Sequence, residues 1–96
     1  MAMNITVQVD FHSTIQSVFG QKSTGITLSH PLTVRNLLDV LCISRERRER
    51  IFDDSGQLRS DLAIFINGRN IHFLGGIDTV LNNGDKMAIF PPVTGG

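Results

Sequence analysis

The sequence predicts an α+β domain in which one main helix packs against a mixed sheet of four or five strands. Residues 3–11 alternate apolar and polar side chains, as a half-buried strand does, and residues 86–90 form another apolar strand near the other end. Between them, residues 34–42 carry the three- and four-residue apolar spacing of an amphipathic helix. A chain of 96 residues has room for one domain of this kind, with a single modest core.

The first predicted strand presents one apolar face. The members of that face are Met3, Ile5, Val7, Val9 and Phe11. Residues 12–20 predict a short helical turn, which Gly20 can end because glycine adopts the left-handed conformation without steric cost. Residues 25–29 predict a second short strand.

The main helix is predicted to begin after Thr33. The hydroxyl of Thr33 can accept a hydrogen bond from a free backbone amide of the first helical turn. The apolar positions of the helix define one buried face: Val34, Leu37, Leu38, Leu41 and Cys42. We therefore expect Cys42, the one cysteine of the chain, to be a buried structural thiol.

A charged segment follows at residues 45–52, with the sequence RERRERIF. It predicts a second helical piece, in which Glu46 and Arg50 are four residues apart and able to form an ion pair. We expect its arginines to lie in solvent, and binding to an acidic partner surface is the alternative.

Two more strands complete the predicted sheet. Residues 62–66, LAIFI, are apolar at every position, which is typical of a central strand covered on both faces. Tight-turn signals follow at residues 67–69 and 82–85. Residues 86–90 form the last strand, which ends at two prolines because proline has no amide hydrogen to donate to a ladder.

The first and last strands are both strongly apolar, and we expect them to pair in parallel at the centre of the sheet. Together with one main helix, this is the β-grasp arrangement of ubiquitin-like proteins. The chain is thus predicted to consist of a β-grasp domain at residues 1–90 and an extended C-terminal tail at residues 91–96, which ends in Gly-Gly.

Composition excludes several classes of function. The formal net charge is zero, which removes the broad electrostatic argument for binding nucleic acid or a membrane surface. A single cysteine excludes an internal disulfide framework and indicates a reducing compartment. No apolar run approaches the ~20 residues of a membrane helix, and the N-terminal residues lack the pattern of a signal peptide, so we expect a cytoplasmic protein. We find no metal-ligand spacing, phosphate loop or nucleophile–base pair, and expect no metal, no bound cofactor and no catalysis by this chain alone.

The sequence resembles the MoaD/ThiS family of ubiquitin-like sulfur carriers along nearly its whole length. The matching segments, in chain order, are VQVDF, TVRNLLDVL, LAIFINGR, IHFLGG and NNGDKMAIFPPVTGG, of which the terminal PPVTGG is the most specific. The resemblance is strongest to the MoaD-type small subunits of molybdopterin synthase and to archaeal ubiquitin-like small modifier proteins.

This resemblance implies a function for Gly96. A partner, an ATP-dependent adenylyltransferase of the ubiquitin-activating type, would adenylate the C-terminal carboxylate. A sulfur donor would then convert it to a thiocarboxylate that donates sulfur in molybdopterin (molybdenum cofactor) biosynthesis. ATP would be used by the activating partner, and the acceptor would be the large subunit of molybdopterin synthase.

Three alternatives share the same fold. The first is the same sulfur-carrier chemistry serving thiamine, cysteine or tRNA thiolation. The second is a ubiquitin-like protein modifier, conjugated to lysine through Gly96. The third is an inert ubiquitin-like binding module.

The tail has the physical properties that activation requires. The carboxylate of Gly96 is ionised near neutral pH, and a carboxylate is a poor acyl donor until it is activated. Neither terminal glycine has a side chain that would crowd the acyl carbon, and the two prolines favour an extended backbone. At about 3.1 Å per residue, residues 91–96 reach roughly 19 Å. We expect the remaining tail residues to contact the partner: Pro91, Pro92, Val93, Thr94 and Gly95.

Phe65 and Phe90 are predicted to form a partner-docking patch. If the alternate isoleucines of residues 62–66 face the helix, Phe65 lies on the opposite face of the sheet. The same parity in residues 86–90 places Phe90 on that face, and exposed aromatic side chains suit a protein interface. The alternative is the inverted parity, with both rings in the core.

Overall fold

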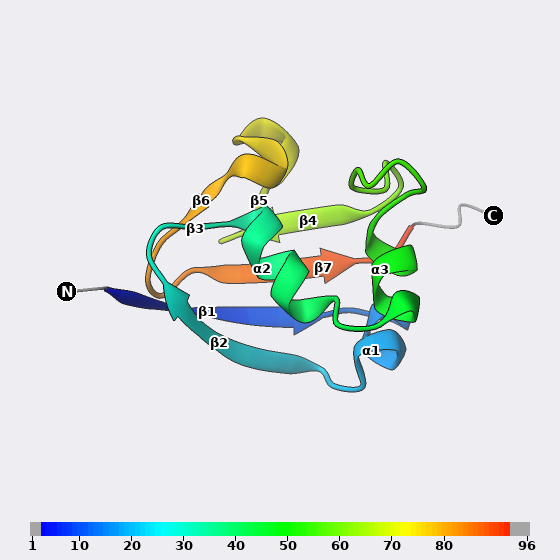
Figure 1. Cartoon of the computed structure of the whole chain (residues 1–96), viewed down its shortest axis with the longest axis horizontal. Coiled ribbons are helices and arrows are strands. Elements are labelled where there is room, and N and C mark those ends of the chain that lie inside the picture. Colours follow the sequence, from blue (N-terminus) through cyan, green and yellow to red (C-terminus); the bar gives the residue numbers. More distant parts are fainter. Residues whose placement is uncertain (1–2, 93–96) are drawn as a thin grey trace.

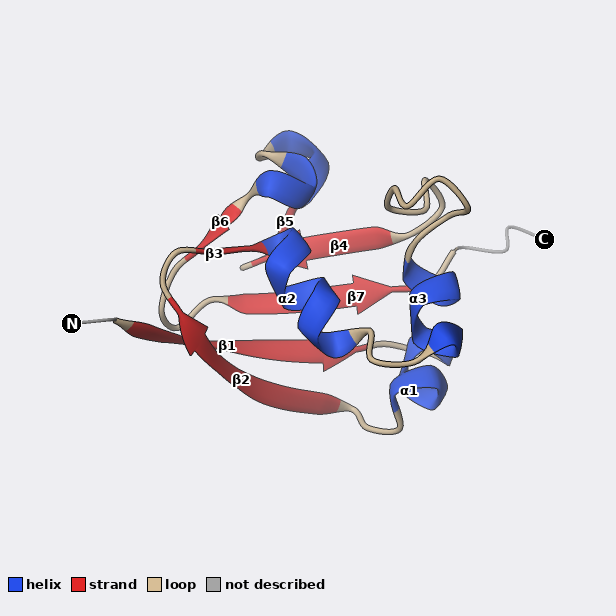
Figure 2. Ribbon diagram, viewed as in Figure 1, coloured by secondary structure: helices blue, strands red, loops and turns tan. Residues whose placement is uncertain are grey.

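The computed structural model describes residues 3–92 of the chain. It contains a five-stranded mixed sheet, with helix α2 crossing one of its faces (Figures 1 and 2). The predicted tail residues Val93, Thr94, Gly95 and Gly96 lie outside the described residues. The strands of this sheet, in spatial order, are β2 (Ser23–Ser29), β1 (Asn4–Phe11), β7 (Lys86–Phe90), β4 (Ala63–Ile66) and β5 (Arg69–Asn70).

The remaining elements connect and cover this sheet. A two-stranded ribbon joins β3 (Leu32–Thr33) to β6 (Val80–Leu81). The α-helices are α1 (Thr14–Phe19), α2 (Val34–Leu41) and α3 (Arg45–Ile51), and two 3-10 turns are η1 (Ile71–Phe73) and η2 (Gly76–Asp78). α1 and α3 contact each other at the end of the sheet where β1 and β7 terminate (Figure 1).

The predicted parallel pairing of the first and last strands is confirmed. β1 and β7 lie side by side at the centre of the sheet, with Val9 beside Met87 and Phe11 beside Ile89. β2 and β4 flank this pair, and each runs antiparallel to the strand that it joins. The mixed sheet of the predicted β-grasp is therefore built from segments at opposite ends of the sequence.

The core lies between this sheet and α2. The predicted inward positions of β1 are buried from Ile5 onward, as is the whole apolar face predicted for the main helix. Met3 departs from the prediction: β1 begins at Asn4, and the side chain of Met3, which precedes the first paired residue, is 71% exposed.

The ends of the helices follow the local sequence signals. Thr33 caps α2 as predicted: its hydroxyl accepts a hydrogen bond from the amide of Asn36 at 3.2 Å. The Asn36 side chain accepts one in return from the amide of Thr33, also at 3.2 Å, which completes a reciprocal cap. Gly20 ends α1 in the left-handed conformation, with φ at 74°.

The charged helix α3 is fixed to the rest of the protein by Arg47. Its guanidinium donates hydrogen bonds to the carbonyls of Leu41 and Phe19, both at 3.2 Å, and lies 5.0 Å above the ring of Phe19. Arg47 thus joins the ends of α2 and α1 to α3, whereas most of the helix lies in solvent as expected.

The ion pair on α3 is not the one that we predicted. Arg45 pairs with Glu49 at 2.9 Å, in place of Glu46 with Arg50. Both pairs are four residues apart, so the spacing alone did not distinguish them.

Cys42 is buried, as predicted. Burial raises the pKa of its thiol from the ordinary 9.0 to about 11, an effect that the nearby Arg48 and Arg47 only partly oppose. The thiol is therefore protonated near neutral pH, and only the thiolate is an effective nucleophile. Within residues 3–92, none of the helices is long and apolar enough to cross a membrane.

We predict that Arg47→Met destabilises the fold by about 1–3 kcal/mol, because it removes the guanidinium from two carbonyls and keeps the length of the apolar stem. Urea unfolding followed by circular dichroism measures this change. The matched control is Arg45→Met, whose native side chain is 91% exposed and which we expect to change stability by less than about 0.5 kcal/mol. Equal losses in the two variants would contradict the role assigned to Arg47.

We also predict that Cys42 reacts slowly with iodoacetamide in the native protein. A pKa of about 11 instead of 9.0 lowers the thiolate fraction near neutral pH by about a hundredfold, and burial restricts access further. Mass spectrometry of samples taken over time, with and without urea, gives both rates. Similar rates in the folded and unfolded protein would show that the thiol is accessible.

Candidate functional site

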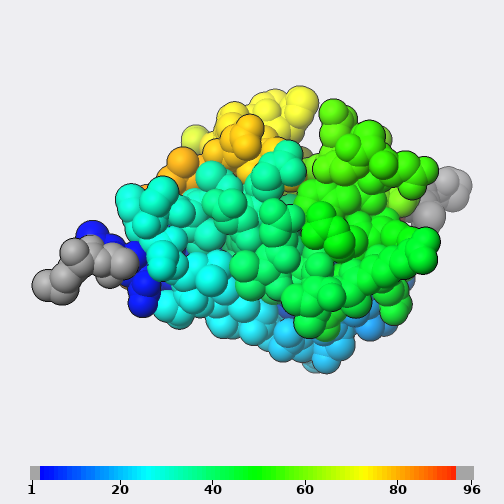
Figure 3. Space-filling view, in the orientation of Figure 1, coloured from blue at the N-terminus to red at the C-terminus, as the bar shows by residue number. Residues whose placement is uncertain are grey.

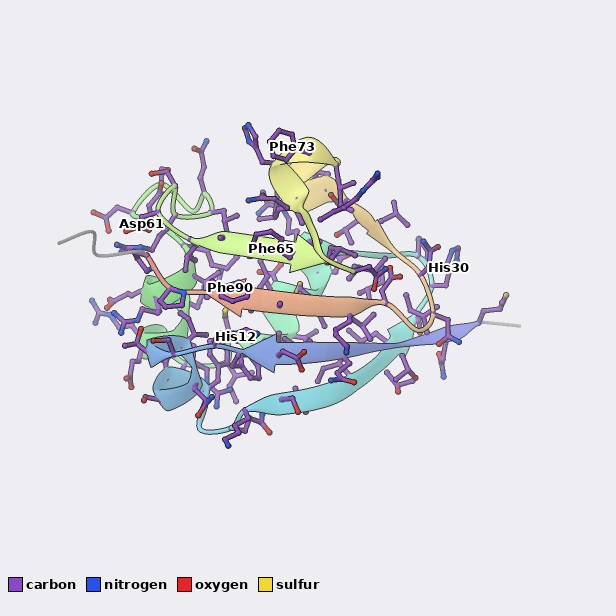
Figure 4. All side chains as sticks on the ribbon, turned by 180° about the vertical axis from the view of Figure 1, so that it is seen from behind. His12, His30, Asp61, Phe65, Phe73 and Phe90 are labelled. Atoms are coloured by element: carbon purple, nitrogen blue, oxygen red, sulfur yellow. The ribbon has the colours of Figure 1, made fainter. Side chains whose placement is uncertain are left out.

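The candidate site lies on the face of the sheet opposite α2. Figure 3 shows the other face, where the cyan and green segments that contain α2 and α3 form a continuous surface over the sheet. Seen from behind, in Figure 4, the sheet has no helix across it in the described part of the chain, and Phe65 and Phe90 lie on this open face. Residues of β4 and β7 on this face are therefore available to a partner.

The alternation of β4 and β7 has the predicted parity. Four inward side chains are buried: Ile64, Ile66, Met87 and Ile89. Four outward side chains, which we call the docking patch, are half-buried: Ala63, Phe65, Ala88 and Phe90. The prediction that residues 62–66 form a strand covered on both faces is wrong for the outward face, because the described residues place no element over it.

The register of the two strands brings the aromatic rings of the docking patch together. Phe65 lies opposite Ala88, and Phe90 lies opposite Ala63, so each ring has a small neighbour across the ladder. The rings meet on the diagonal, with centroids 5.4 Å apart and planes at 83°. This edge-to-face contact is a favoured aromatic geometry and gives the patch a defined shape.

His12 extends the docking patch toward β1. Its ring stacks on Phe90 at a centroid distance of 4.2 Å, with 11° between the planes, and its backbone amide donates to the carbonyl of Ile89 at 3.1 Å. We did not predict this contact from the sequence. The outward parity of β1, continued one step past Phe11, is the signal that would have identified it.

The docking patch forms one wall of an open cavity of about 480 Å³. The lining is mostly apolar, with Lys86 and Asp61 as its charged members. Arg59 donates two hydrogen bonds to the carboxylate of Asp61, at 3.1 and 3.0 Å, and this contact holds the pKa of Asp61 below its usual range. Asp61 is thus an ionised and already paired group, so Lys86 is the cation available to a partner.

The predicted site residues fall into two groups. The structure brings together Phe65, Phe90 and Pro91, which line the same cavity, and Pro92 follows as a half-buried residue. The predicted contacts of Val93, Thr94, Gly95 and the reactive Gly96 lie outside the described residues. The start of the tail and the docking patch are therefore one continuous surface.

The chemistry of this surface suits association. In the part of the chain that the structure describes, no group of three or more His, Cys, Asp or Glu side chains could hold a metal ion. A half-buried aromatic cluster on a sheet face that no described element covers is the kind of surface on which protein partners dock.

The fold and this surface define the chain as a small ubiquitin-like β-grasp protein. It belongs to the ThiS family, whose family model matches residues 11–96. The resemblance to the MoaD/ThiS sulfur carriers is thereby confirmed.

Individual relatives carry two kinds of name. The chain is 38% identical over 66 residues to a putative sulfur carrier protein of Archaeoglobus fulgidus, a match that covers 68% of this chain and 75% of that protein. It is 30% identical over 90 residues to small archaeal modifier protein 3 of Haloferax volcanii, covering 94% and 98% respectively. The crystal structure of small archaeal modifier protein 1 from Haloferax volcanii superimposes with a TM-score of 0.82 at 25% identity, covering 95% of this chain and 99% of that one.

We predict that Phe90→Ala weakens binding of the activating partner that the family resemblance implies about tenfold or more, as truncation of an interface hot spot does. Isothermal titration calorimetry with the cognate adenylyltransferase measures the dissociation constant. Val40→Ala on α2 is the control, because Val40 is also apolar and 43% exposed but lies on the other side of the molecule. If both variants bind as the native protein does, Phe90 is not part of the interface.

Proposed function

We propose that this chain is a sulfur carrier whose Gly96 carboxylate is adenylated and then converted to a thiocarboxylate. The observation that carries the proposal is the family match, which continues through the PPVTGG segment to residue 96. A relative that is named as a putative sulfur carrier supports it. The proposal requires Gly96 to be the last residue of the protein in the cell, and the intact mass of the native protein checks this first.

The proposed chemistry has two steps. A carboxylate oxygen of Gly96 attacks the α-phosphate of ATP, and pyrophosphate leaves. In the acyl adenylate that results, AMP is a good leaving group, so a sulfide ion can attack the acyl carbon and expel it. The product is a C-terminal thiocarboxylate; when the sulfur arrives as a persulfide, a thiol must afterwards cleave the sulfur–sulfur bond.

The described residues contribute to this chemistry by positioning the partner and the tail, and none of them takes part in the reaction itself. The docking patch and Pro91 hold the partner beside the start of the tail, and Pro91 and Pro92 keep the chain extended as it leaves the sheet. ATP binds to the activating partner and no cofactor binds to this chain, so the partners supply the catalysis. The proposed location is the cytoplasm, where a single unpaired thiol stays reduced.

Cys42 does not compete with Gly96 as a place for sulfur. It is the one cysteine of the chain, it is buried, and its thiol has a pKa of about 11. A sulfur atom gained by the folded protein is therefore assigned to the tail.

For the acceptor, we propose the large subunit of molybdopterin synthase, on the strength of the family resemblance of the sequence. Thiamine, cysteine and tRNA thiolation use the same carrier chemistry and are the alternatives. Co-purification from native extract identifies the acceptor, and a partner from one of those pathways would replace the molybdopterin assignment without changing the carrier chemistry.

A second candidate function is protein modification. The 30% identity with small archaeal modifier protein 3, over 94% of this chain, favours it specifically. The first step is the same: the Gly96 carboxylate is adenylated. The ε-amine of a lysine on the target then attacks the acyl carbon, AMP leaves, and an isopeptide bond forms.

We predict that incubation with the activating partner, ATP and sulfide replaces one oxygen by sulfur at Gly96. Intact mass followed by peptide mapping detects this exchange. Deletion of Gly96, or addition of one residue after it, abolishes the exchange, because either change misplaces the carboxylate that must meet ATP. Both variants keep the native thermal unfolding curve, and normal activation of the extended protein would refute the proposal.

Two controls distinguish the candidate functions. Cys42→Ala is expected to leave the exchange unchanged, because the exchange replaces an oxygen of the Gly96 carboxylate and the Cys42 thiol has no oxygen to exchange. In cell extract, adducts that join Gly96 to lysines of other proteins identify a modifier, and their absence together with the sulfur exchange identifies a carrier.

A further inference from the structure

Phe73 is a second aromatic contact surface that the docking patch does not include. Its side chain is 82% exposed, the largest exposed fraction among the large hydrophobic residues that the structure describes. It belongs to η1, which follows β5 at the edge of the sheet, and Figure 4 shows it on the same side of the molecule as Phe65 and Phe90.

The fold holds Phe73 out of the core. Ile71, at the start of η1, is buried and anchors the turn. The side chain of Asn70 caps this turn by accepting a hydrogen bond from the amide of His72 at 2.9 Å, and the amide of Leu74 closes it by donating to the carbonyl of Ile71 at 2.9 Å. With both ends of the turn fixed, the ring of Phe73 stays in solvent.

Phe73 and the docking patch line one continuous groove. Phe73 borders an open cavity of about 500 Å³ together with Phe65, Gly68, Arg69 and Asn70. Phe65 and Gly68 also line the cavity of about 480 Å³ that contains Phe90 and Pro91. We call the two cavities together the aromatic groove; it runs from the start of the tail to Phe73.

Gly68 lines both halves of the aromatic groove. It turns the chain between β4 and β5 with φ at 84°, a conformation that favours glycine, and a Cβ atom there would meet no other atom within 4 Å.

The charges along the aromatic groove are mainly positive. Lys86 lines one half and Arg69 lines the other, whereas the carboxylate of Asp61 is already held by Arg59. A complementary partner presents apolar side chains to the rings and carboxylates to these two cations.

We propose that Phe73 is a docking residue for the ATP-using activating partner, at the end of the aromatic groove remote from the tail. The proposal rests on the proposed function, because it requires a partner that binds the tail and adenylates Gly96. Activation is the step common to the carrier and the modifier, so this partner binds the groove in either case. Since Phe73 is far from the start of the tail along the groove, it contributes to the affinity of the complex and leaves the rate of adenylation within the complex unchanged.

The experiment measures pyrophosphate release by the cognate adenylyltransferase at increasing concentrations of this chain. We expect Phe73→Ser to raise KM about tenfold or more at unchanged kcat, and Phe73→Leu to recover part of the affinity because it restores apolar surface. The matched control is Ile43→Ser: Ile43 is 78% exposed and lies between α2 and α3, on the opposite side of the sheet. This control is expected to match the native protein, and all three variants are expected to unfold at the native temperature.

Three results would overturn the inference while the proposed function stands. The first is the same KM for Phe73→Ser as for Ile43→Ser, and the second is a lower kcat at unchanged KM. The third is that Phe73→Ser weakens binding of the sulfur acceptor and leaves activation by the adenylyltransferase unchanged. Analytical ultracentrifugation tests another occupant, and a native dimer that Phe73→Ser dissociates would assign the groove to a second copy of the chain. If the native protein is not adenylated by its cognate partner, the proposed function itself fails and the inference fails with it.

Discussion

The parallel pairing of β1 with β7 is the interaction on which the other features of this protein depend. It places Val9 beside Met87 and Phe11 beside Ile89, so the buried side chains of the two strands share one inward face under α2. Because the side-chain period of a strand is two, this register also decides that Phe90 points outward. A shift of one residue would bury the docking patch and expose the core. The same pairing therefore stabilises the domain and displays the surface beside the tail.

The division of labour within the sheet follows from this constraint. One face of the sheet stabilises the domain, because its isoleucines and valines pack on α2. At the end of the sheet, Arg47 joins the three helices by hydrogen bonds to Leu41 and Phe19. The other face carries aromatic rings over alanines, with cations at its margin. In the proposed function, the folded domain serves recognition of the partner, and the chemistry takes place at the tail.

Local signals made much of this arrangement predictable. Thr33, Gly20 and the alternation of the two central strands act within a few residues of sequence, and the structure confirms each of them. The predicted ion pair of Glu46 with Arg50 was wrong because Arg45 and Glu49 have the same spacing and form the pair instead. His12 was missed although the parity of β1 indicates its side, whereas Arg47 could not be assigned a function because the carbonyl of Phe19 is brought close to it only by the tertiary fold. The exposure of Phe73 likewise depends on a capped turn at the edge of the sheet.

The central position of β7 also bears on how the protein is made. Synthesis proceeds from the N-terminus, so β1 emerges from the ribosome long before the strand that completes the middle of the sheet. Until residues 86–90 are available, a nascent chain lacks both the centre of its core and half of the aromatic surface. A partner that binds through that surface consequently binds complete chains and does not bind chains that lack residues 86–90.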